Sequence, residues 1–208
     1  MLFLTLLAAG SSLQAQPGFI QLFNGKDLTG WKVGGDQSTF TVKDGAIVSH
    51  GPVSHCFYDG PVKDHHFVNF ELRVDMMTEP GANGGVYFDT EFQDGGFPKK
   101  GFEVQVNNTH ADHIKSGSLY HVVDIGADDI KDLVKDNEWF TEDILVEGKT
   151  VTIKLNDKQV VKWTQPDDWA GTKDFADRRV GAGYTIALQG HDPKSIVHYK
   201  NIRIKPLP

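Results

Sequence analysis

Two polar side chains stand two residues apart in an apolar stretch near the middle of the chain. Glu103 and Gln105 alternate with Phe102, Val104 and Val106. On an extended strand, this spacing places the carboxylate and the carboxamide on one face and the three apolar side chains on the other. Such a carboxylate can accept a proton, coordinate a metal ion or form a hydrogen bond with a hydroxyl group. Alternation alone leaves two interpretations open, a solvated sheet surface and the wall of a site.

A pair with the same spacing follows late in the sequence. Gln189 and His191 are two residues apart, at the end of an expected strand and just before Asp192. An imidazole titrates near neutral pH, so it can serve as an acid or a base. A histidine at a strand end is also commonly a surface group or a turn residue that makes a hydrogen bond. His191 is therefore a candidate site residue with both interpretations open.

A third group of candidate residues is formed by His110, Asp112 and His113, with His121 further along. Neutral imidazoles and a carboxylate this close in sequence could bind a divalent metal ion. Loop residues do not fix a coordination geometry, so a solvated loop is the competing interpretation. A divalent metal is the one cofactor that the sequence suggests, with Glu103, His110 and His113 as candidate ligands.

The elements that must position these residues are mostly β-strands. Strict alternation of apolar and polar residues over 68–76 predicts a long half-buried strand, and Asp44-Gly45 predicts a hairpin turn between strands 40–43 and 46–49. Only 128–135 has a helix-like composition. Further short strands are expected over 86–88, 101–106, 119–123, 144–146, 151–155, 159–163, 185–189 and 196–204. This pattern predicts an all-β fold, an antiparallel β-sandwich with one short helical segment.

Composition narrows the class of protein. The 208 residues are 39% hydrophobic and 24% charged, which is typical of a soluble globular chain. The net charge of −7 argues against nucleic acid or an anionic membrane surface as a partner, because both require clustered Lys and Arg. Cys56 is the single cysteine, so an intrachain disulfide is excluded and a small core residue is expected.

The N-terminal segment has the features of an export signal. Leu2–Ala9 is an apolar run, and Leu13-Gln14-Ala15 ends in a small residue suited to cleavage. We therefore expect residues 1–15 to be a signal peptide and 16–208 to form a single domain. A buried N-terminal strand or helix is the alternative. No other apolar run approaches the ~18 residues that a membrane span needs.

Six short motifs in order identify a family resemblance. They are Phe23–Trp31, Gly84–Phe88, Glu103–Gln105, Gly117–Tyr120, Ile186–His191 and Asn201–Leu207. With them the chain resembles the 3-keto-disaccharide hydrolase domain family, formerly domain of unknown function 1080, from about Phe19 to Leu207. The resemblance implies a concanavalin-like jelly roll whose concave face binds carbohydrate. It also implies exported bacterial proteins, periplasmic or at the cell surface, that process glycosides.

The resemblance further implies a chemistry. A partner sugar 3-dehydrogenase oxidises a glycoside at C3, which makes the neighbouring C2 hydrogen acidic. The glycosidic bond is then cleaved by elimination followed by hydration, or by net hydrolysis. A base must take the C2 proton, a donor or a cation must hold the enolate oxygen, and an acid must assist the leaving oxygen.

Roles for particular residues follow from the resemblance. Glu103 is the first candidate for the base or a metal ligand, and His191 is the second catalytic candidate. Gln105 would form a hydrogen bond with a sugar hydroxyl or an oxyanion. Tyr120 could also protonate the leaving oxygen. The full set of candidate substrate-binding residues is Gln105, Tyr87, Tyr120, Gln189 and Trp139, of which the aromatic ones offer faces for a sugar ring.

Two other functions stay open. The same fold serves non-catalytic carbohydrate-binding domains, so binding without turnover is the main alternative. An ordinary glycosidase would need a second carboxylate about 5–9.5 Å from Glu103. Asp89 and Glu91 are the nearest in sequence, and no motif pairs either of them with Glu103.

Overall fold

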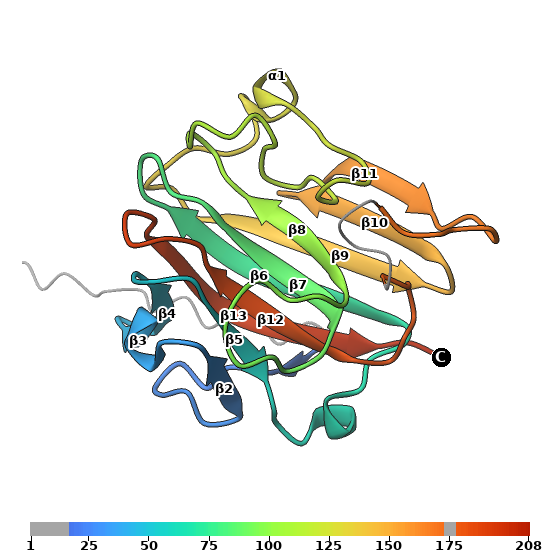
Figure 1. The fold of residues 1–208 in the computed structure, drawn as a ribbon, viewed down its shortest axis with the longest axis horizontal. Coiled ribbons are helices and arrows are strands. Elements are labelled where there is room, and N and C mark those ends of the chain that lie inside the picture. The colour runs from blue at the N-terminus through green and yellow to red at the C-terminus, as the bar shows by residue number, and fades with distance from the viewer. Residues whose placement is uncertain (1–16, 173–177) are drawn as a thin grey trace, which may run out of the picture.

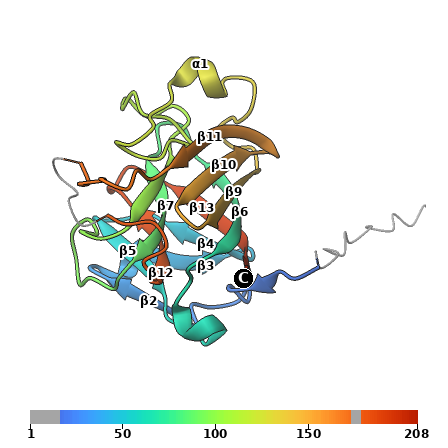
Figure 2. The ribbon, with the colours of Figure 1, turned by 90° about the vertical axis from the view of Figure 1, so that its right-hand side faces the viewer.

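The computed structural model describes residues 17–172 and 178–208. The expected signal peptide, residues 1–15, lies outside the described residues. Two antiparallel β-sheets pack face to face, and the short helix α1 (Ala127–Ile130) stands at one end (Figures 1 and 2). None of the described helices is long and apolar enough to cross a membrane. The predicted all-β sandwich is confirmed.

The two sheets differ in size. The eight-stranded sheet has the order β11-β10-β9-β6-β13-β4-β3, with β1 also paired to β13, and the five-stranded sheet has the order β2-β5-β12-β7-β8. The strands of the larger sheet are β1 (Ile20–Gln21), β3 (Phe40–Lys43), β4 (Ala46–Ser49), β6 (Phe70–Thr78), β9 (Phe140–Glu147), β10 (Thr150–Leu155), β11 (Lys158–Thr164) and β13 (Val197–Pro206). Those of the smaller sheet are β2 (Trp31–Gly34), β5 (Ser54–Tyr58), β7 (Gly84–Thr90), β8 (Phe102–Val106) and β12 (Thr185–Gly190).

Alternation along the strands decides which face enters the core. Phe70, Leu72, Val74 and Met76 of β6 are fully buried, and the residues between them are partly exposed. Phe102, Val104 and Val106 of β8 are likewise fully buried in the core between the sheets. Because side chains alternate across a strand, Glu103 and Gln105 point to the outer face of the five-stranded sheet.

The predicted hairpin is confirmed in detail. β3 and β4 pair from Phe40 opposite Ser49 to Lys43 opposite Ala46. Asp44 and Gly45 both adopt positive φ, 51° and 77°, as a type I′ turn requires.

Two predicted elements are corrected. Residues 119–123 do not form a strand, because His121 adopts a φ of 59° and the chain turns back so that Val122 and Val123 both donate to the Leu119 carbonyl. Isolated bridges join Leu119 to Val104 and to Val123 instead. The helix expected over 128–135 is shorter, and α1 ends at Ile130.

Cys56 behaves as the predicted core residue. Its side chain is fully buried in the main core, and its thiol is free. Burial raises the pKa of this thiol, so it stays protonated and unreactive.

Candidate functional site

A cavity of about 510 Å³ opens on the outer face of the five-stranded sheet. Its size falls within the range of about 300–1,000 Å³ typical of small-molecule sites. The residues that line it are Asn83, Tyr87, Phe97, Glu103, Gln105, Tyr120, His121, Gln189 and His191. Six of the residues singled out in the sequence, Tyr87, Glu103, Gln105, Tyr120, Gln189 and His191, therefore meet in one cavity.

Glu103 is the centre of a hydrogen-bond network in this cavity. Strand β7 lies between β8 and β12, and it places Tyr87 directly opposite Glu103. The Tyr87 hydroxyl donates to Glu103 Oε2 at 2.6 Å. Gln189, 86 residues away in sequence, donates from Nε2 to Glu103 Oε1 at 3.0 Å. The sheet thus unites the two pairs that the sequence showed separately.

The second residue of the first pair adds another donor. With its amide nitrogen assigned toward Glu103, Gln105 donates to Oε1 at 3.2 Å and to the Gly84 carbonyl at 3.0 Å. Gly85 provides the space for this arrangement, because a Cβ there would lie 2.5 Å from Glu103 Oε1. Both oxygens of the carboxylate are therefore held in place by protein donors.

Burial dominates the electrostatics of Glu103. The residue is 5% exposed, and desolvation raises the pKa of its carboxyl group, against the hydrogen bond from Tyr87 and the charge of Arg178. Burial, with the neighbouring Glu103 charge, raises the pKa of Tyr87 well above its ordinary value. Tyr87 therefore keeps its proton and Glu103 is the acceptor. A carboxyl group with a raised pKa suits proton transfer near neutral pH.

Arg178 is a residue of this region that the sequence did not single out. It is fully buried, and its guanidinium Nη1 donates to the Tyr120 carbonyl at 3.3 Å. Burial raises the pKa values of Tyr87, Glu103 and Tyr120, and the positive charge of Arg178 partly offsets this rise. Arg178 stands in a segment without a motif, so only the fold could reveal its place.

His191 lies at the cavity beside a carboxylate. Its Nδ1 is 2.9 Å from Asp192 Oδ2. The pKa of Asp192 is lowered to about 2: burial opposes this shift, but hydrogen bonds from Ser195 and His191 outweigh it. Since the ionised Asp192 occupies Nδ1, Nε2 is the ring nitrogen left for a ligand.

The structure does not bring every candidate to the cavity. Trp139 is 40% exposed and lines a separate pocket with His198 and Lys200, whose Nζ lies 3.6 Å from the centre of the indole ring. Its strand neighbour Phe140 begins β9 of the other sheet, so Trp139 cannot share a face with Glu103. Its expected role as a substrate platform at this cavity is not supported.

The candidate metal ligands Glu103, His110 and His113 are not grouped as a coordination site in the structure. No three His, Cys, Asp or Glu residues within 17–172 and 178–208 are grouped so that they could hold an ion. His113 is highly exposed and pairs with Asp112 at 3.5 Å, while the His110 ring lies 6.0 Å from that of His191. N–H and O–H donors contact both Glu103 oxygens, an environment that suits the carboxylate anion.

Neither candidate partner carboxylate lines the cavity with Glu103. Asp89 accepts a hydrogen bond from the Gly181 backbone at 2.8 Å, and burial raises its pKa to about 7. Glu91 pairs with Lys100 at 2.8 Å. Asp89 therefore fastens the turn before β12, and Glu91 belongs to a surface ion pair.

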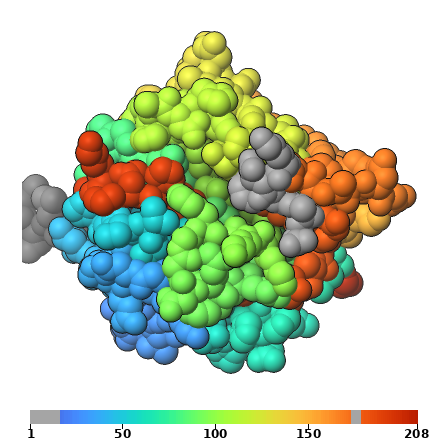
Figure 3. All heavy atoms as spheres, in the orientation of Figure 1, coloured from blue at the N-terminus to red at the C-terminus, as the bar shows by residue number. Residues whose placement is uncertain are grey.

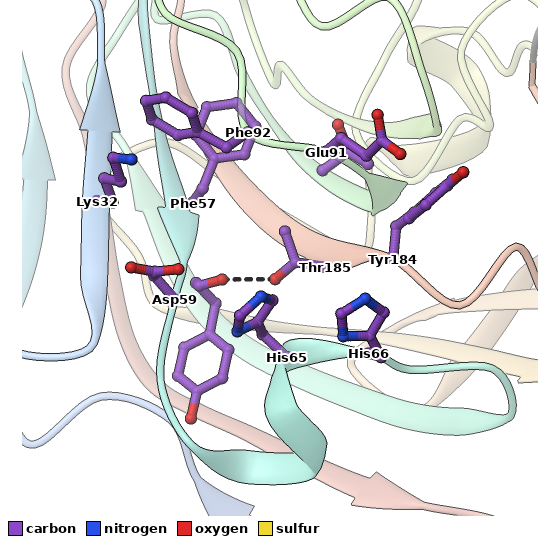
Figure 4. Close-up of a pocket in the computed structure, with 11 residues that line it drawn as sticks. Lys32, Phe57, Asp59, His65, His66, Glu91, Phe92, Tyr184 and Thr185 are labelled. Atoms are coloured by element: carbon purple, nitrogen blue, oxygen red, sulfur yellow. Dashed lines mark hydrogen bonds between the residues drawn. The ribbon is translucent and has the colours of Figure 1, made fainter.

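A second, smaller pocket of about 170 Å³ lies further along the same strands (Figure 4). Phe57 and Phe92 stand together at one end of it, and Thr185 donates to the Tyr58 carbonyl at 2.6 Å near its centre. Glu91 faces this pocket beside Tyr184. This pocket has no buried carboxylate network comparable to that of Glu103.

Two cavity residues, Asn83 and Phe97, were not predicted as site residues, and His121 was named only beside the candidate metal-binding histidines. Asn83 precedes the Gly84-Gly85 pair, and its loop position gave no strand periodicity to interpret. Phe97 belongs to a glycine-rich connection between β7 and β8, and its ring is 47% exposed. The signal available in the sequence was the position of the Phe97 aromatic side chain between Gly95-Gly96 and Pro98.

Comparisons with known proteins find relatives that cover most of the chain. A curated 3-keto-disaccharide hydrolase from Bacteroides thetaiotaomicron is 26% identical over 91% of this chain and 79% of that protein. A crystal structure of a candidate glycosyl hydrolase from Parabacteroides distasonis superposes with a TM-score of 0.76 at 24% identity, covering 92% of this chain and 94% of that one. The carbohydrate-binding module CBM66 from Bacillus subtilis shares the fold, with a TM-score of 0.55 at 12% identity over 85% and 95% of the two chains.

A family model described as the 3-keto-alpha-glucoside-1,2-lyase-like domain matches residues 18–205. This match covers nearly all the described residues, including both sheets and every residue that lines the cavity. The chain therefore belongs to the 3-keto-alpha-glucoside-1,2-lyase-like domain family.

Proposed function

We propose that the protein cleaves 3-keto-glycosides, 3-keto-disaccharides among them, in the cavity around Glu103. The observation that carries this proposal is that Glu103 is the single carboxylate among the described residues that line the cavity. Ordinary retaining and inverting glycosidases need two carboxylates across the scissile bond. Removal of a proton beside a carbonyl needs only one base, so the lining favours chemistry on a sugar that has already been oxidised.

In the proposed reaction, Glu103 takes the proton from C2, and the C–H electrons form the enolate of the C3 ketone. The enolate then collapses to restore the C3 carbonyl, a double bond forms between C1 and C2, and the bond between C1 and the glycosidic oxygen breaks. The leaving oxygen takes a proton from His191. Addition of water to the double bond completes net hydrolysis.

The network supports these roles in physical terms. Burial raises the pKa of Glu103, which makes the carboxylate a stronger base, and the donors of Tyr87, Gln105 and Gln189 keep it oriented. Arg178 supplies positive charge near the place where negative charge develops. Tyr120, which also lines the cavity, is a second donor for a substrate oxygen.

Binding without turnover is the second candidate, and one observation favours it. Both Glu103 oxygens already accept hydrogen bonds from the protein, and a carboxylate so engaged can simply orient the cavity for sugar hydroxyls. A single experiment distinguishes the two functions, because a binding domain would release no sugar.

The test is to incubate the purified protein with a 3-keto-disaccharide and with its unoxidised parent, and to follow the released monosaccharide. Release from the keto sugar alone is expected. Release from both would indicate an ordinary glycosidase, and binding without release would contradict the enzyme proposal. The same assay with a chelator tests the metal hypothesis: a loss of activity that a divalent ion restores would support a metal, and undiminished activity would count against one.

We also propose that the protein is exported, to the periplasm or the cell surface, and works after a sugar 3-dehydrogenase. The support is the apolar Leu2–Ala9 run for export and the need for a ketone at C3 for the dehydrogenase. Fractionation of cells into cytoplasm, periplasm and medium, followed by detection of the mature chain, tests the location. Recovery of an uncleaved chain in the cytoplasm would contradict it.

A further inference from the structure

Residues 91–101 form a segment that crosses the outer face of the five-stranded sheet between β7 and β8. Figure 3 shows the green atoms of this part of the chain standing forward over the sheet. Gln93 fastens the segment from within: its Nε2 donates to the carbonyls of Gly95 at 2.6 Å and Phe97 at 3.0 Å, and its Oε1 accepts from the Lys99 backbone at 3.3 Å. The segment therefore has a defined shape despite its glycines.

The same segment is anchored to the edge strand β2. The Gly35 backbone donates to Asp94 Oδ1 at 3.2 Å. A Cβ at Gly34 would collide with the Gln93 carbonyl, so only glycine lets the segment approach the strand this closely. These contacts fix where the next residues, including Phe97, stand over the sheet.

Phe97 is held by this segment at the cavity. Its ring centre lies 5.9 Å from that of His55 and 5.8 Å from that of His191. His55 is buried while Phe97 is 47% exposed, so the phenyl ring covers the one imidazole and offers its remaining surface to the cavity. An exposed aromatic ring at the rim of a cavity that also carries polar groups offers an apolar face on which a sugar ring can stack.

We infer that Phe97 is the platform on which the leaving sugar of a disaccharide stacks. This inference rests on the proposed function. Glu103, at 5% exposure, lies at the floor of the cavity, whereas Phe97 lies at the rim. The oxidised ring must bring its C2 to Glu103, so the sugar joined through the glycosidic oxygen extends toward the rim. The apolar C–H face of that sugar packs on the phenyl ring.

The segment offers a matched control. Phe92 belongs to the same connection and is 41% exposed, but it lines the second pocket, where its ring lies 5.4 Å from Phe57 and 3.8 Å from Lys32 Nζ (Figure 4). Phe92→Ala removes an aromatic ring of similar exposure from the same segment. It does so without touching the cavity around Glu103.

The experiment compares Phe97→Ala, Phe97→Tyr and Phe92→Ala on two substrates, a 3-keto-disaccharide and methyl 3-keto-glucoside. Phe97→Ala is expected to raise KM for the disaccharide about tenfold with kcat unchanged, the pattern of a lost binding contact. KM for the methyl glycoside should stay constant, because its leaving group does not reach the ring. Phe97→Tyr and Phe92→Ala should behave as wild type on both.

Equal changes on the two substrates, no change on either, or the same effect from Phe92→Ala would overturn the inference. If no keto sugar is turned over, the proposed function fails separately. Dissociation constants for the unoxidised disaccharide and methyl glucoside, measured by saturation-transfer NMR, then decide the role of Phe97. A tenfold loss confined to the disaccharide supports it, and equal losses or none overturn it.

Discussion

Two buried glutamates, one in each sheet, have opposite surroundings. Glu103 of β8 faces a cavity and accepts hydrogen bonds from Tyr87 and Gln189. Glu142 of β9 is fully buried, lies opposite Val74 and Leu155 in the strand register, and has no hydrogen-bond partner among the described residues for either oxygen. Burial raises the pKa of both carboxyl groups, that of Glu142 to well above its ordinary value.

The contrast shows what burial alone can and cannot indicate. A raised pKa marks both residues, yet only Glu103 combines it with donors that fix the carboxylate and with space for a ligand. Burial among apolar neighbours disfavours the charged form of Glu142, and a lone carboxyl group there costs stability. A catalytic role is therefore proposed for Glu103 and not for Glu142.

The largest expected effect is the difference in kcat between variants of Glu103 and Glu142. Glu103→Gln keeps the size of the side chain but removes the base, so kcat on a 3-keto-disaccharide should fall by about 10²–10⁴. Glu142→Gln, measured in the same assay of released sugar, should leave kcat unchanged. Comparable losses in both variants would show that the activity follows stability instead of the base.

Gly85→Ala should produce the next largest effect, through the position of the carboxylate. The new Cβ would lie 2.5 Å from Glu103 Oε1 and 2.9 Å from its Cγ, so the side chain must move. We expect kcat to fall by about 10–100-fold, because small misplacements of a catalytic group are costly. Gly126→Ala, where the nearest atom is 3.8 Å away, is the control and should keep full activity.

Replacing Glu142 by Met should raise the stability of the protein. The change exchanges a buried carboxyl group without a hydrogen-bond partner for an apolar side chain of similar size. A gain of about 1–3 kcal/mol in the free energy of unfolding at pH 7 is expected, to be read from the urea midpoint with an unchanged slope. A loss of stability would mean that the carboxyl group has a partner after all.

The pH dependence of stability provides a smaller test of the same contrast. The pKa of Glu142 is raised in the folded state, so its contribution is fully present below the unfolded pKa of about 4.3 and is lost as pH rises toward the folded value. The difference in unfolding free energy between Glu142→Met and wild type should therefore grow in favour of the variant from pH 4 to pH 8. A constant difference would contradict the raised pKa.

The strands could be predicted from the sequence better than the contacts that join the residues of the candidate site. Alternation along β6 and β8 decided burial, because a strand between a core and an outer face must repeat every two residues. Residue spacing and the family motifs indicated Glu103, Gln105, Gln189 and His191. Neither indicated the hydrogen bond that joins the two pairs through the strand order β8-β7-β12.

The sequence did not predict the positions of three residues, Arg178, Phe97 and Trp139. The first two stand in connections without periodicity, so their positions depend on contacts such as those of Gln93 with the backbone. Trp139 precedes a strand of the eight-stranded sheet, and no local pattern reveals to which sheet a strand belongs. Glu142 lies before the strand expected over 144–146, so nothing in that expectation indicated its burial in β9.

The most direct test of the central claim follows the C2 proton itself. A 3-keto sugar that bears no leaving group at C1 is incubated in D₂O with wild type, Glu103→Gln or Glu142→Gln, and loss of the C2 hydrogen is followed by proton NMR. Wild type and Glu142→Gln should exchange this hydrogen far faster than the uncatalysed background, and Glu103→Gln should fall to that background. Undiminished exchange in Glu103→Gln would contradict the assignment of Glu103 as the base.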